Sequence, residues 1–455
     1  MKKIFSINPA TEETLKEYSL LTKDELENKI QLSLQAFEAW KKRSFAKKKI
    51  LLNKVAAILR RDKEKFARTI TLEMGKTIKE SLGEVEKCAW GCGYFAEQGE
   101  IMLKKEIIKT EATESYLRFD PLGPIFIVMP WNFPFWQVFR VSVPALMAGN
   151  VILLKHASNV PQCSFLIEKI FIEAGFPKGV FQSLLIDPSM SQTVINHKNV
   201  RAVSLTGSEK AGAIVAATAG AVMKKSVLEL GGSDPFIILD DADVKKAATV
   251  ATSARLNVTG QVCIAAKRFI VQEKIAIQFV AELTKLFLLK KIGNPLLLDT
   301  DMGPLSSRKI LETIEKQVED SVKMGAKIVV GGKRLIGKGY FYPPTVITNI
   351  TSKMPIYTEE TFGPVAVIII VKDDIEAIKI ANDTRFGLGA SVWTKSLKRA
   401  QKFIEELEVG SVFVNSMVKS DPRLPIGGTK SSGYGRELSS YGLKEFVNIK
   451  TVFVE

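Results

Sequence analysis

The stretch AVSLTGSEKAGAIVAATAGAVMKKSVLELGG, residues 202–232, decides the fold class of this chain. An apolar strand pattern ends at Leu205, a glycine turn from Gly207 to Gly212 follows, and an apolar helical pattern leads to a second strand at 226–230. Glycines at such a turn let backbone amides and a helix N-terminus approach an anion closely. The spacing is not GxGxxG, and an ordinary strand-to-helix junction is the commoner explanation. The stretch therefore predicts a βαβ unit and leaves a phosphate site open.

The alternation of strand and helix continues on both sides of this unit. Upstream, strands are predicted at 125–129 and 151–154, and a helix begins near Pro161, where a first-turn proline is tolerated. Downstream of Gly232, apolar strands alternate with helical patterns as far as the strand GSVFVN at 410–415. Such alternation is typical of parallel sheets. The sequence predicts an α/β protein with a Rossmann-type dinucleotide domain and a second α/β domain.

The first third of the chain carries helical patterns. Thr22 and Glu25 have the spacing of a capping box, and a second helical pattern runs toward a glycine stop at Gly75. Residues 106–122 differ, because β-formers alternate there with few core-sized apolar runs. This segment is predicted to be a protruding hairpin or arm.

The charge balance is basic, with 64 Lys and Arg against 49 Asp and Glu and a formal net charge of +15, which suits anionic partners. The basic runs fall on amphipathic helical patterns whose solvated faces explain them, and no zinc-finger, RNP or KH motif occurs. No apolar run reaches the ~18 residues of a membrane span, and the N-terminus lacks the apolar region of a secretory signal. We expect no nucleic-acid partner, no membrane association and a cytoplasmic location.

The chain contains four cysteines, too few for a disulfide framework, and this number indicates a reducing compartment. No ligand cluster with metal-binding spacing occurs, so no metal site is predicted. Cys263, in GQVCIAAKR, raises the question of its base, because a thiol reacts as thiolate and histidine is its commonest activator. Only His156 and His197 exist. Most single cysteines are small buried hydrophobic residues, and Cys263 alone is no stronger a signal than that.

Seven motifs occur in an order and spacing that resemble the aldehyde dehydrogenase superfamily, over nearly the whole chain from INPATEE to KTVFVE. They are PWNFP (130–134), LLK (153–155), TGS (206–208), LELGG (228–232), GQVC (260–263), EETFGP (359–364) and GGTKSSGYGRE (427–437). Within the superfamily the chain is most similar to bacterial succinate-semialdehyde dehydrogenases, through LLKHAS, ELGGSDPFI and GRELSSYGLKEF.

The resemblance implies an aldehyde dehydrogenase-like fold with three parts. These are an NAD(P)-binding domain of residues 1–105 and 123–231, a catalytic domain of residues 232–432, and a β oligomerisation arm of residues 106–122 and 433–455. The arm implies a homodimer or a homotetramer, because alternating strands at an edge are compatible with pairing between subunits.

The resemblance assigns the chemistry to Cys263, Glu229 and Asn132. The Cys263 thiolate attacks the aldehyde, and the Asn132 amide and the Cys263 N–H stabilise the resulting oxyanion. Glu229 takes the place of the missing histidine, and it activates the water that hydrolyses the thioester. Without the family, Glu229 reads as a paired core acid and Asn132 as a turn asparagine.

The resemblance also implies a site for NAD or NADP. Its predicted residues are Met129, Trp131, Lys155, Ser158, Gly207, Ser208, Leu230, Glu360 and Phe362. Many NAD-preferring relatives have a glutamate where this chain has Ser158, three residues after Lys155. A serine removes the repulsion of a 2′-phosphate and offers a hydrogen bond, so NADP is expected to be tolerated.

The predicted substrate is a small aldehyde with a carboxylate tail, bound by Arg140, Arg423 and Phe133. Arg140 stands eight residues after Asn132, about two helical turns, and a guanidinium binds a carboxylate bidentately. A structural ion pair is the competing interpretation of Arg140. Ile426 replaces the ring of the usual PFGG motif and is expected to reshape the mouth of the pocket.

Succinic semialdehyde is the first candidate substrate. Glutaric semialdehyde is close behind, since one methylene changes binding by only ~1–3 kcal/mol. An enzyme that transfers the acyl group to coenzyme A, an unspecific enzyme for apolar aldehydes, and a catalytically silent binding protein on this fold are the alternatives.

Overall fold

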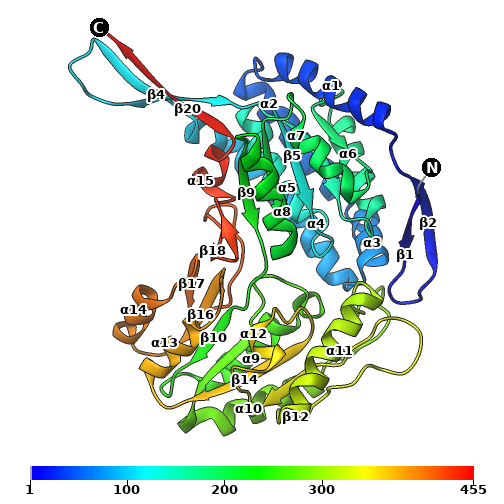
Figure 1. The fold of residues 1–455 in the computed structure, drawn as a ribbon, viewed down its shortest axis with the longest axis vertical. Coiled ribbons are helices and arrows are strands. Elements are labelled where there is room, and N and C mark those ends of the chain that lie inside the picture. Colours follow the sequence, from blue (N-terminus) through cyan, green and yellow to red (C-terminus); the bar gives the residue numbers. More distant parts are fainter. Residues whose placement is uncertain (1–2) are drawn as a thin grey trace.

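The computed structural model describes residues 3–455, and residues 1 and 2 of the predicted first domain lie outside them. The described residues form a six-stranded sheet, a seven-stranded sheet, a three-stranded sheet and two short two-stranded pairings. Figure 1 shows the two large sheets in separate bodies, one above the other, and the three-stranded sheet projecting from the upper body. The predicted α/β class is confirmed.

The upper body is built on the six-stranded sheet. In spatial order its strands are β19 (Gly433–Tyr434), β9 (Lys225–Glu229), β8 (Ala202–Thr206), β5 (Pro124–Met129), β6 (Val151–His156) and β7 (Phe181–Ser183). All neighbours are parallel except the edge strand β19, which is antiparallel to β9. The four strands predicted from the sequence are therefore adjacent, and their carboxyl ends meet at one edge. Ligands of open parallel sheets bind at that edge.

Helices cover both faces of this sheet. They are α1 (Lys23–Trp40), α2 (Phe45–Arg61), α3 (Lys63–Met74), α4 (Ile78–Met102), α5 (Trp136–Ala148), α6 (Pro161–Glu173), the 3-10 turn η1 (Pro188–Met190), α7 (Ser191–Asn196), α8 (Glu209–Ala221) and α15 (Ser439–Lys444). The capping box of Thr22 and Glu25 begins α1, and Gly75 ends α3 in the left-handed conformation, both as predicted. The second predicted helix is broken at Asp62 into α2 and α3.

The lower body contains the seven-stranded sheet. Its strands in spatial order are β12 (Lys327–Val330), β13 (Thr345–Thr348), β14 (Val365–Val371), β11 (Arg268–Gln272), β10 (Pro235–Ile238), β16 (Gly389–Trp393) and β17 (Ser411–Val414). Its helices are α9 (Val244–Leu256), η2 (Asn257–Gly260), α10 (Glu273–Leu288), α11 (Arg308–Lys323), α12 (Pro355–Thr358), α13 (Asp374–Asn382) and α14 (Leu397–Glu406). Only β12 runs antiparallel to its neighbour. A short pairing of β15 (Phe386–Gly387) with β18 (Thr429–Lys430) lies beside this sheet.

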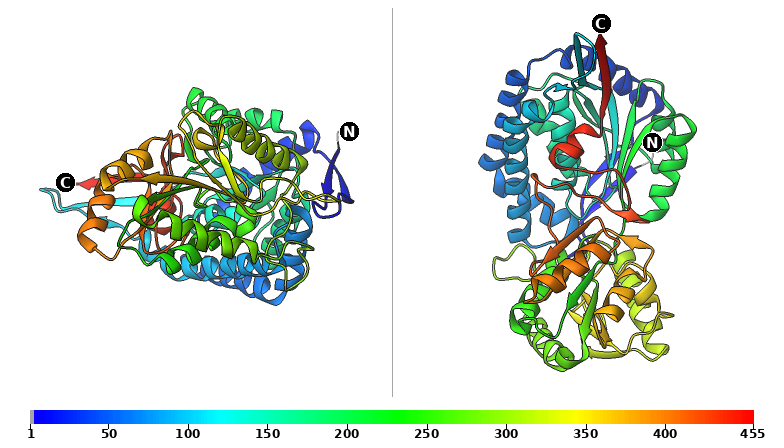
Figure 2. Two further views of the ribbon diagram at one scale, coloured as in Figure 1. Left: turned by 90° about the horizontal axis from the view of Figure 1, so that it is seen from below. Right: turned by 90° about the vertical axis from the view of Figure 1, so that its left-hand side faces the viewer.

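The predicted arm is a three-stranded antiparallel sheet of β3 (Glu106–Ile107), β4 (Glu114–Pro121) and β20 (Val447–Val454). Figure 2 shows it extending beyond the upper body. Residues 433–446 differ from the prediction that placed them in the arm. β19 pairs with β9, and Leu443 is buried in the core of the upper body, because this segment carries its own apolar residues.

The sequence did not predict the first elements of the structure. β1 (Lys3–Ile7) and β2 (Thr14–Ser19) form an antiparallel ribbon whose turn contacts the lower body. The Tyr340 N–H donates to the Pro9 carbonyl at 3.0 Å, and the Gly339 N–H donates to Glu12 Oε1 at 3.1 Å. The N-terminal turn therefore ties the two bodies together.

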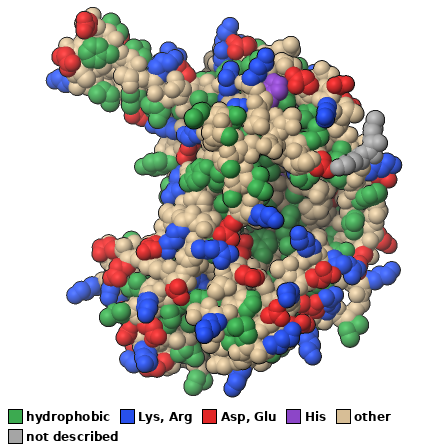
Figure 3. Space-filling model, in the orientation of Figure 1, with side chains coloured by type: hydrophobic (Ala, Val, Ile, Leu, Met, Phe, Trp, Pro, Cys, Tyr) green, Lys and Arg blue, Asp and Glu red, His purple; other side chains and the backbone are tan. Residues whose placement is uncertain are grey.

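Two features of the surface bear on partners. On the face shown in Figure 3, basic and acidic side chains are interspersed rather than gathered into a field of one sign. Among residues 3–455 no helix combines the length and the apolar composition needed to cross a bilayer.

Candidate active site

Cys263 follows a turn that is held in an unusual backbone conformation. Val258, Thr259 and Gly260 all have positive φ, at 52°, 54° and 77°. A side chain on Gly260 would lie 2.3 Å from the Gly363 carbonyl oxygen, so only glycine fits. Glu80 Oε1 accepts from the Val258 N–H at 2.6 Å, which fixes the turn from α4. Such strain is retained where surrounding contacts over-determine the backbone, and here it presents the thiol.

The Cys263 thiol is half-buried, and burial raises its pKa to about 12. The charges of Arg140 and Lys267 oppose the shift, whereas that of Glu229 adds to it. Lys267 Nζ donates to the carbonyls of Cys263 and, at 3.0 Å, Val262. The thiol is therefore protonated near neutral pH and needs a base. Lys267 was not predicted, although it stands only four residues after Cys263.

Neither histidine supplies that base. His156 Nε2 bonds the Pro134 carbonyl at 2.7 Å, and its Nδ1 accepts from the Ala157 N–H at 2.9 Å. Burial lowers the pKa of His156 to about 4, so the ring is neutral. His197 lies beside Glu27, at 3.3 Å. Both rings are engaged away from the thiol.

Glu229, the last residue of β9, is buried near Cys263. Within the described residues neither of its carboxylate oxygens has a hydrogen-bond partner, and Arg140 Nη2 is 3.9 Å from Oε2. Burial raises the pKa of Glu229 to about 8; Arg140 opposes this shift and Glu437 adds to it. A carboxyl group with such a pKa exchanges protons in the range where enzymes work.

Arg140 lies between two acids rather than free in solvent. Its Nε forms an ion pair with Glu437 Oε2, and both side chains are almost fully buried. Glu437 is in turn held by backbone hydrogen bonds in both directions with Ile426. Ile426 itself is buried in the core and does not line the cavities beside Cys263, contrary to the expected reshaping of the pocket mouth. Glu437 ends the quoted GGTKSSGYGRE motif, but sequence alone gave it no chemistry.

Asn132 lies in a turn that a buried ion pair supports. Lys76 Nζ pairs with Glu84 and donates to the Asn132 carbonyl at 2.9 Å. Glu84 Oε1 also accepts from the backbone N–H groups of Phe135 and Trp136, both at 2.8 Å, at the start of α5. The Asn132 Nδ2 donates to the Gln261 carbonyl at 2.9 Å, next to the Cys263 loop. Asn132 is therefore a turn asparagine whose side chain is fixed beside the Cys263 loop, and both residues line one cleft.

Replacing Glu84 by alanine is expected to destabilise the protein by about 3–5 kcal/mol, because it leaves Lys76 buried without a counter-ion. The shift in the first unfolding transition in urea measures this loss. Glu86→Ala on the same helix is the control, since Glu86 pairs at the surface with Arg60 and is worth about 1 kcal/mol or less. Equal shifts for the two variants would contradict the supporting role of the buried pair.

One side of Cys263 opens into a cleft of about 240 Å³ between the two bodies. Its lining includes the predicted cofactor residues Trp131, Gly207, Ser208, Leu230, Glu360 and Phe362, together with Asn132, Gln137 and Cys263. These residues come from separate motifs of the sequence. Most of them meet at the carboxyl edge of the six-stranded sheet, and the lower body supplies Cys263, Glu360 and Phe362.

The residues of this cleft fit a dinucleotide. Ser208 caps α8 by accepting from the Ala211 N–H at 3.4 Å, so the free amides of the first turn lie beside the cleft. A side chain on Gly212 would lie 2.5 Å from Leu230 Cδ1, so glycine allows α8 to approach β9 closely. Glu360 Oε1 is held by the Gly232 N–H at 3.1 Å.

Three predicted cofactor residues lie next to the cleft without lining it. Met129 and Lys155 stand at the carboxyl ends of the paired strands β5 and β6, and Ser158 is exposed two residues after β6. Burial lowers the pKa of Lys155. They extend the same edge of the sheet, in the direction that an elongated ligand would follow.

The other side of Cys263 opens into a cavity of about 150 Å³. Its lining includes the predicted Phe133 and Arg140, and also Lys87, Trp136 and Ser420, which were not predicted. Arg423 does not line it: its side chain is 65% exposed and binds both oxygens of Asp421, at 2.8 and 2.7 Å. The structure does not support a substrate contact by Arg423, because its neighbouring acid already satisfies it.

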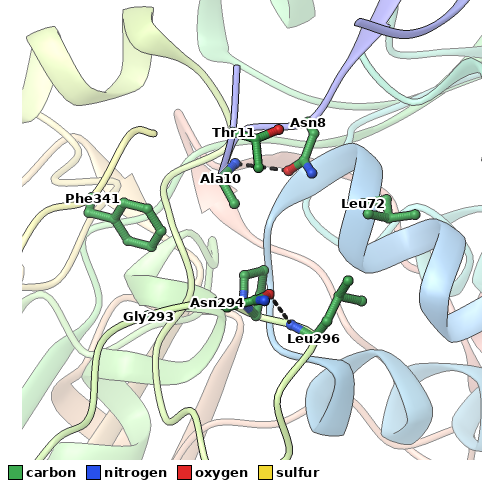
Figure 4. Close-up of a pocket in the computed structure, with 9 residues that line it drawn as sticks. Asn8, Ala10, Thr11, Leu72, Gly293, Asn294, Leu296 and Phe341 are labelled. Atoms are coloured by element: carbon green, nitrogen blue, oxygen red, sulfur yellow. Dashed lines mark hydrogen bonds between the residues drawn. The ribbon is translucent and has the colours of Figure 1, made fainter. Parts of the chain in front are cut away.

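A larger cavity, of about 390 Å³, lies elsewhere, between the N-terminal turn, α3 and the loop after α10 (Figure 4). The side-chain oxygens of Asn8 and Asn294 accept from the N–H groups of Ala10 and Leu296, at 2.9 and 3.0 Å. Its polar side chains cap their own turns, and none of the described residues that line it is titratable. Size alone therefore does not locate the chemistry.

A cysteine between a dinucleotide cleft and a small cavity, with a buried carboxyl group nearby, is the arrangement of an enzyme that works through a covalent thiol intermediate. The model of the aldehyde dehydrogenase family matches residues 1–452. The chain belongs to the aldehyde dehydrogenase family, and the resemblance seen in its motifs is confirmed.

Individual relatives extend this comparison. A probable NADP⁺ succinate-semialdehyde dehydrogenase of Synechocystis sp. is 49% identical over 99% of both chains. An NADP⁺ succinate-semialdehyde dehydrogenase of Mycobacterium tuberculosis is 46% identical over 99% of both chains. The crystal structure of succinic semialdehyde dehydrogenase from Streptococcus pyogenes in complex with NADP⁺ is 39% identical, covers 99% of both chains and has a TM-score of 0.97.

Proposed function

We propose that this protein oxidises succinic semialdehyde to succinate with NADP or NAD. The observation that carries the proposal is that Cys263 lines both the dinucleotide cleft and a cavity with cationic residues, with Glu229 buried nearby. The names of the relatives support the substrate and the cofactor class. We propose the upper body as the cofactor domain and the lower body as the catalytic domain.

The proposed reaction begins when Glu229 accepts the proton of Cys263. The thiolate attacks the aldehyde carbon, and the oxyanion that forms is stabilised by the Cys263 N–H and by the second hydrogen of the Asn132 amide. The predicted residues that line the cleft would hold a nicotinamide cofactor, which would supply the hydride acceptor for this oxidation. Glu229 releases its first proton to solvent and then accepts a proton from a water molecule, whose oxygen attacks the thioester carbon. The C–S bond breaks, the acid is released and the Cys263 thiolate is regenerated. The proposed cofactor contacts are the predicted residues that line the cleft and its edge.

The substrate assignment is tested by kcat/KM for succinic semialdehyde, glutaric semialdehyde, butanal and hexanal, each with NADP and with NAD. A preference for the two carboxylated aldehydes by about 100-fold is expected, because a charge-assisted contact with the acid tail is absent for the neutral ones. If kcat/KM for hexanal equals that for the carboxylated aldehydes, the protein is still an aldehyde dehydrogenase, but the proposal of an acid substrate is wrong.

Ser158→Glu is expected to lower kcat/KM with NADP by about 100-fold relative to NAD, because a carboxylate repels the 2′-phosphate. The measurement is the ratio of kcat/KM for the two cofactors. Ser158→Ala is the control, since it removes the hydroxyl without adding charge, and it should change the ratio by less than about 10-fold. An unchanged ratio in Ser158→Glu would place the 2′-phosphate elsewhere.

We also propose that the arm joins subunits into a homodimer or homotetramer. β20 is an edge strand of the three-stranded sheet, and the arm exposes Ile107, Ile449 and Phe453. An exposed strand edge with apolar side chains is a template for pairing with a second chain.

The four free cysteines support the proposed cytoplasmic location.

A further inference from the structure

Lys87 on α4 lines the cavity that contains Cys263. Its Nζ lies 4.7 Å from the centroid of the Trp136 ring and donates to Ser420 Oγ at 2.6 Å. Trp136 Nε1 donates to the same oxygen at 3.0 Å. Lys87, Trp136 and Ser420 all line the cavity that contains Cys263. Two side chains from the upper body and one from the loop after β17 thus form one polar cluster.

This cluster has donors to spare and no further acceptor capacity. A hydroxyl oxygen has two lone pairs, and at Ser420 both receive a donor, so its O–H hydrogen is left to donate. The Lys87 ammonium has three N–H bonds and uses one on Ser420. An acceptor with two oxygens, such as a carboxylate, matches this arrangement.

The charge of Lys87 is not balanced by a neighbouring acid. Among residues 3–455 no carboxylate oxygen lies within 4.0 Å of its Nζ, whereas Arg140 is paired with Glu437. Glu84 and Asp421 are close enough to raise the pKa of Lys87, but both already pair with other cations. Arg140 therefore brings a compensated charge to the cavity, and Lys87 brings an uncompensated one.

We propose that Lys87 is a specificity-determining residue, whose ammonium group, together with the Ser420 hydroxyl, binds the carboxylate tail of the substrate. The inference rests on the proposed oxidation of an ω-carboxy aldehyde and deepens it. Lys87 selects for the anionic tail, and Arg140 supports the electrostatics of the pocket while held by Glu437. The contact between Lys87 and Ser420 could not be predicted from local sequence patterns, because the two residues are 333 positions apart.

Titration of Lys87 gives the proposal a second readout. The charged and titratable groups around it are Arg140 on α5, Cys263 on the loop before β11, Asp421 and Lys419 on the loop after β17, and Glu84 and Cys88 on its own helix. Burial lowers the pKa of Lys87 to about 8, and Arg140 acts in the same direction. The ammonium form is therefore present below pH 8 and is lost above it, so binding of a carboxylate weakens as the pH rises through 8.

The test compares kcat/KM for succinic semialdehyde and for butanal with NADP, at pH 7, in four full-length proteins: wild type, Lys87→Met, Lys87→Arg and Lys79→Met. Lys87→Met should lower the ratio of succinic semialdehyde to butanal by about 10- to 100-fold, mainly through KM. Lys87→Arg should retain most of the ratio, because it keeps the charge. Lys79→Met removes an exposed lysine from the same helix and should leave the ratio at the wild-type value.

The outcomes separate this inference from the proposed function. If wild type prefers succinic semialdehyde and Lys87→Met has the same ratio, the role of Lys87 is overturned and the proposed function stands. If wild type has no preference, the proposed substrate and the role of Lys87 fail together. Succinate inhibition is the binding readout: its Ki should rise above pH 8 in wild type and stay level to higher pH in Lys87→Arg. A level Ki in wild type would overturn the proposal.

Discussion

Cys263→Ala is expected to lose aldehyde oxidation by about 10⁴-fold or more, since removing a nucleophile removes the covalent route altogether. The residual rate is measured as NADPH formation with succinic semialdehyde. Binding of NADPH, followed by fluorescence, should be retained, because the cleft is built mainly from the carboxyl edge of the six-stranded sheet. The loss is then chemical rather than structural.

Cys163→Ala is the matched control for this variant. Cys163 is a fully buried thiol on α6, and burial raises its pKa well above the ordinary value, so it is inert. Its loss removes a buried sulfur and should cost about 1–2 kcal/mol of stability while turnover persists. Substantial oxidation by Cys263→Ala would remove the covalent step from the proposed reaction.

Local sequence patterns predicted the parallel strands of both bodies well, because each is an apolar run between turn residues. β5, β6, β8 and β9 begin and end within two residues of their predicted bounds. The N-terminal ribbon and the three-residue strand β7 were missed, since their exposed or very short patterns have no distinct period. The place of residues 433–446 depended on long-range packing against β9 and α5, which no local pattern contains.

The residues of the proposed active site could be predicted where they stand in motifs, and not where their role depends on pairing through space. Cys263, Glu229 and Asn132 stand in short motifs that resemble a family. By contrast, Glu437 and Lys87 acquire meaning only through their partners, Arg140 and Ser420. Arg423 is the opposite case. It stands in a motif loop that suggested a substrate contact, but its side chain pairs with Asp421, two residues away.

Glu229→Gln is expected to lower kcat by about 10³-fold, because glutamine keeps the shape of the side chain and cannot accept a proton from the thiol or from water. Steady-state NADPH formation measures the loss. Hydroxylamine attacks a thioester without a base, so adding it should recover part of the turnover if the acyl-enzyme still forms. If hydroxylamine recovers no turnover and the thiol of the variant still reacts at the wild-type rate, Glu229 is needed before the thioester forms, but not to deprotonate Cys263.

The pH dependence of thiol alkylation distinguishes Glu229 from every other base. Burial raises the pKa of Glu229 to about 8, so its carboxylate form is absent well below pH 8 and present above it. In wild type the rate of alkylation of Cys263 by iodoacetamide should therefore rise through pH 8. In Glu229→Gln this base is missing, and because burial raises the pKa of the Cys263 thiol to about 12, the rise should move to higher pH. Superimposable profiles for the two proteins would mean that another group deprotonates Cys263.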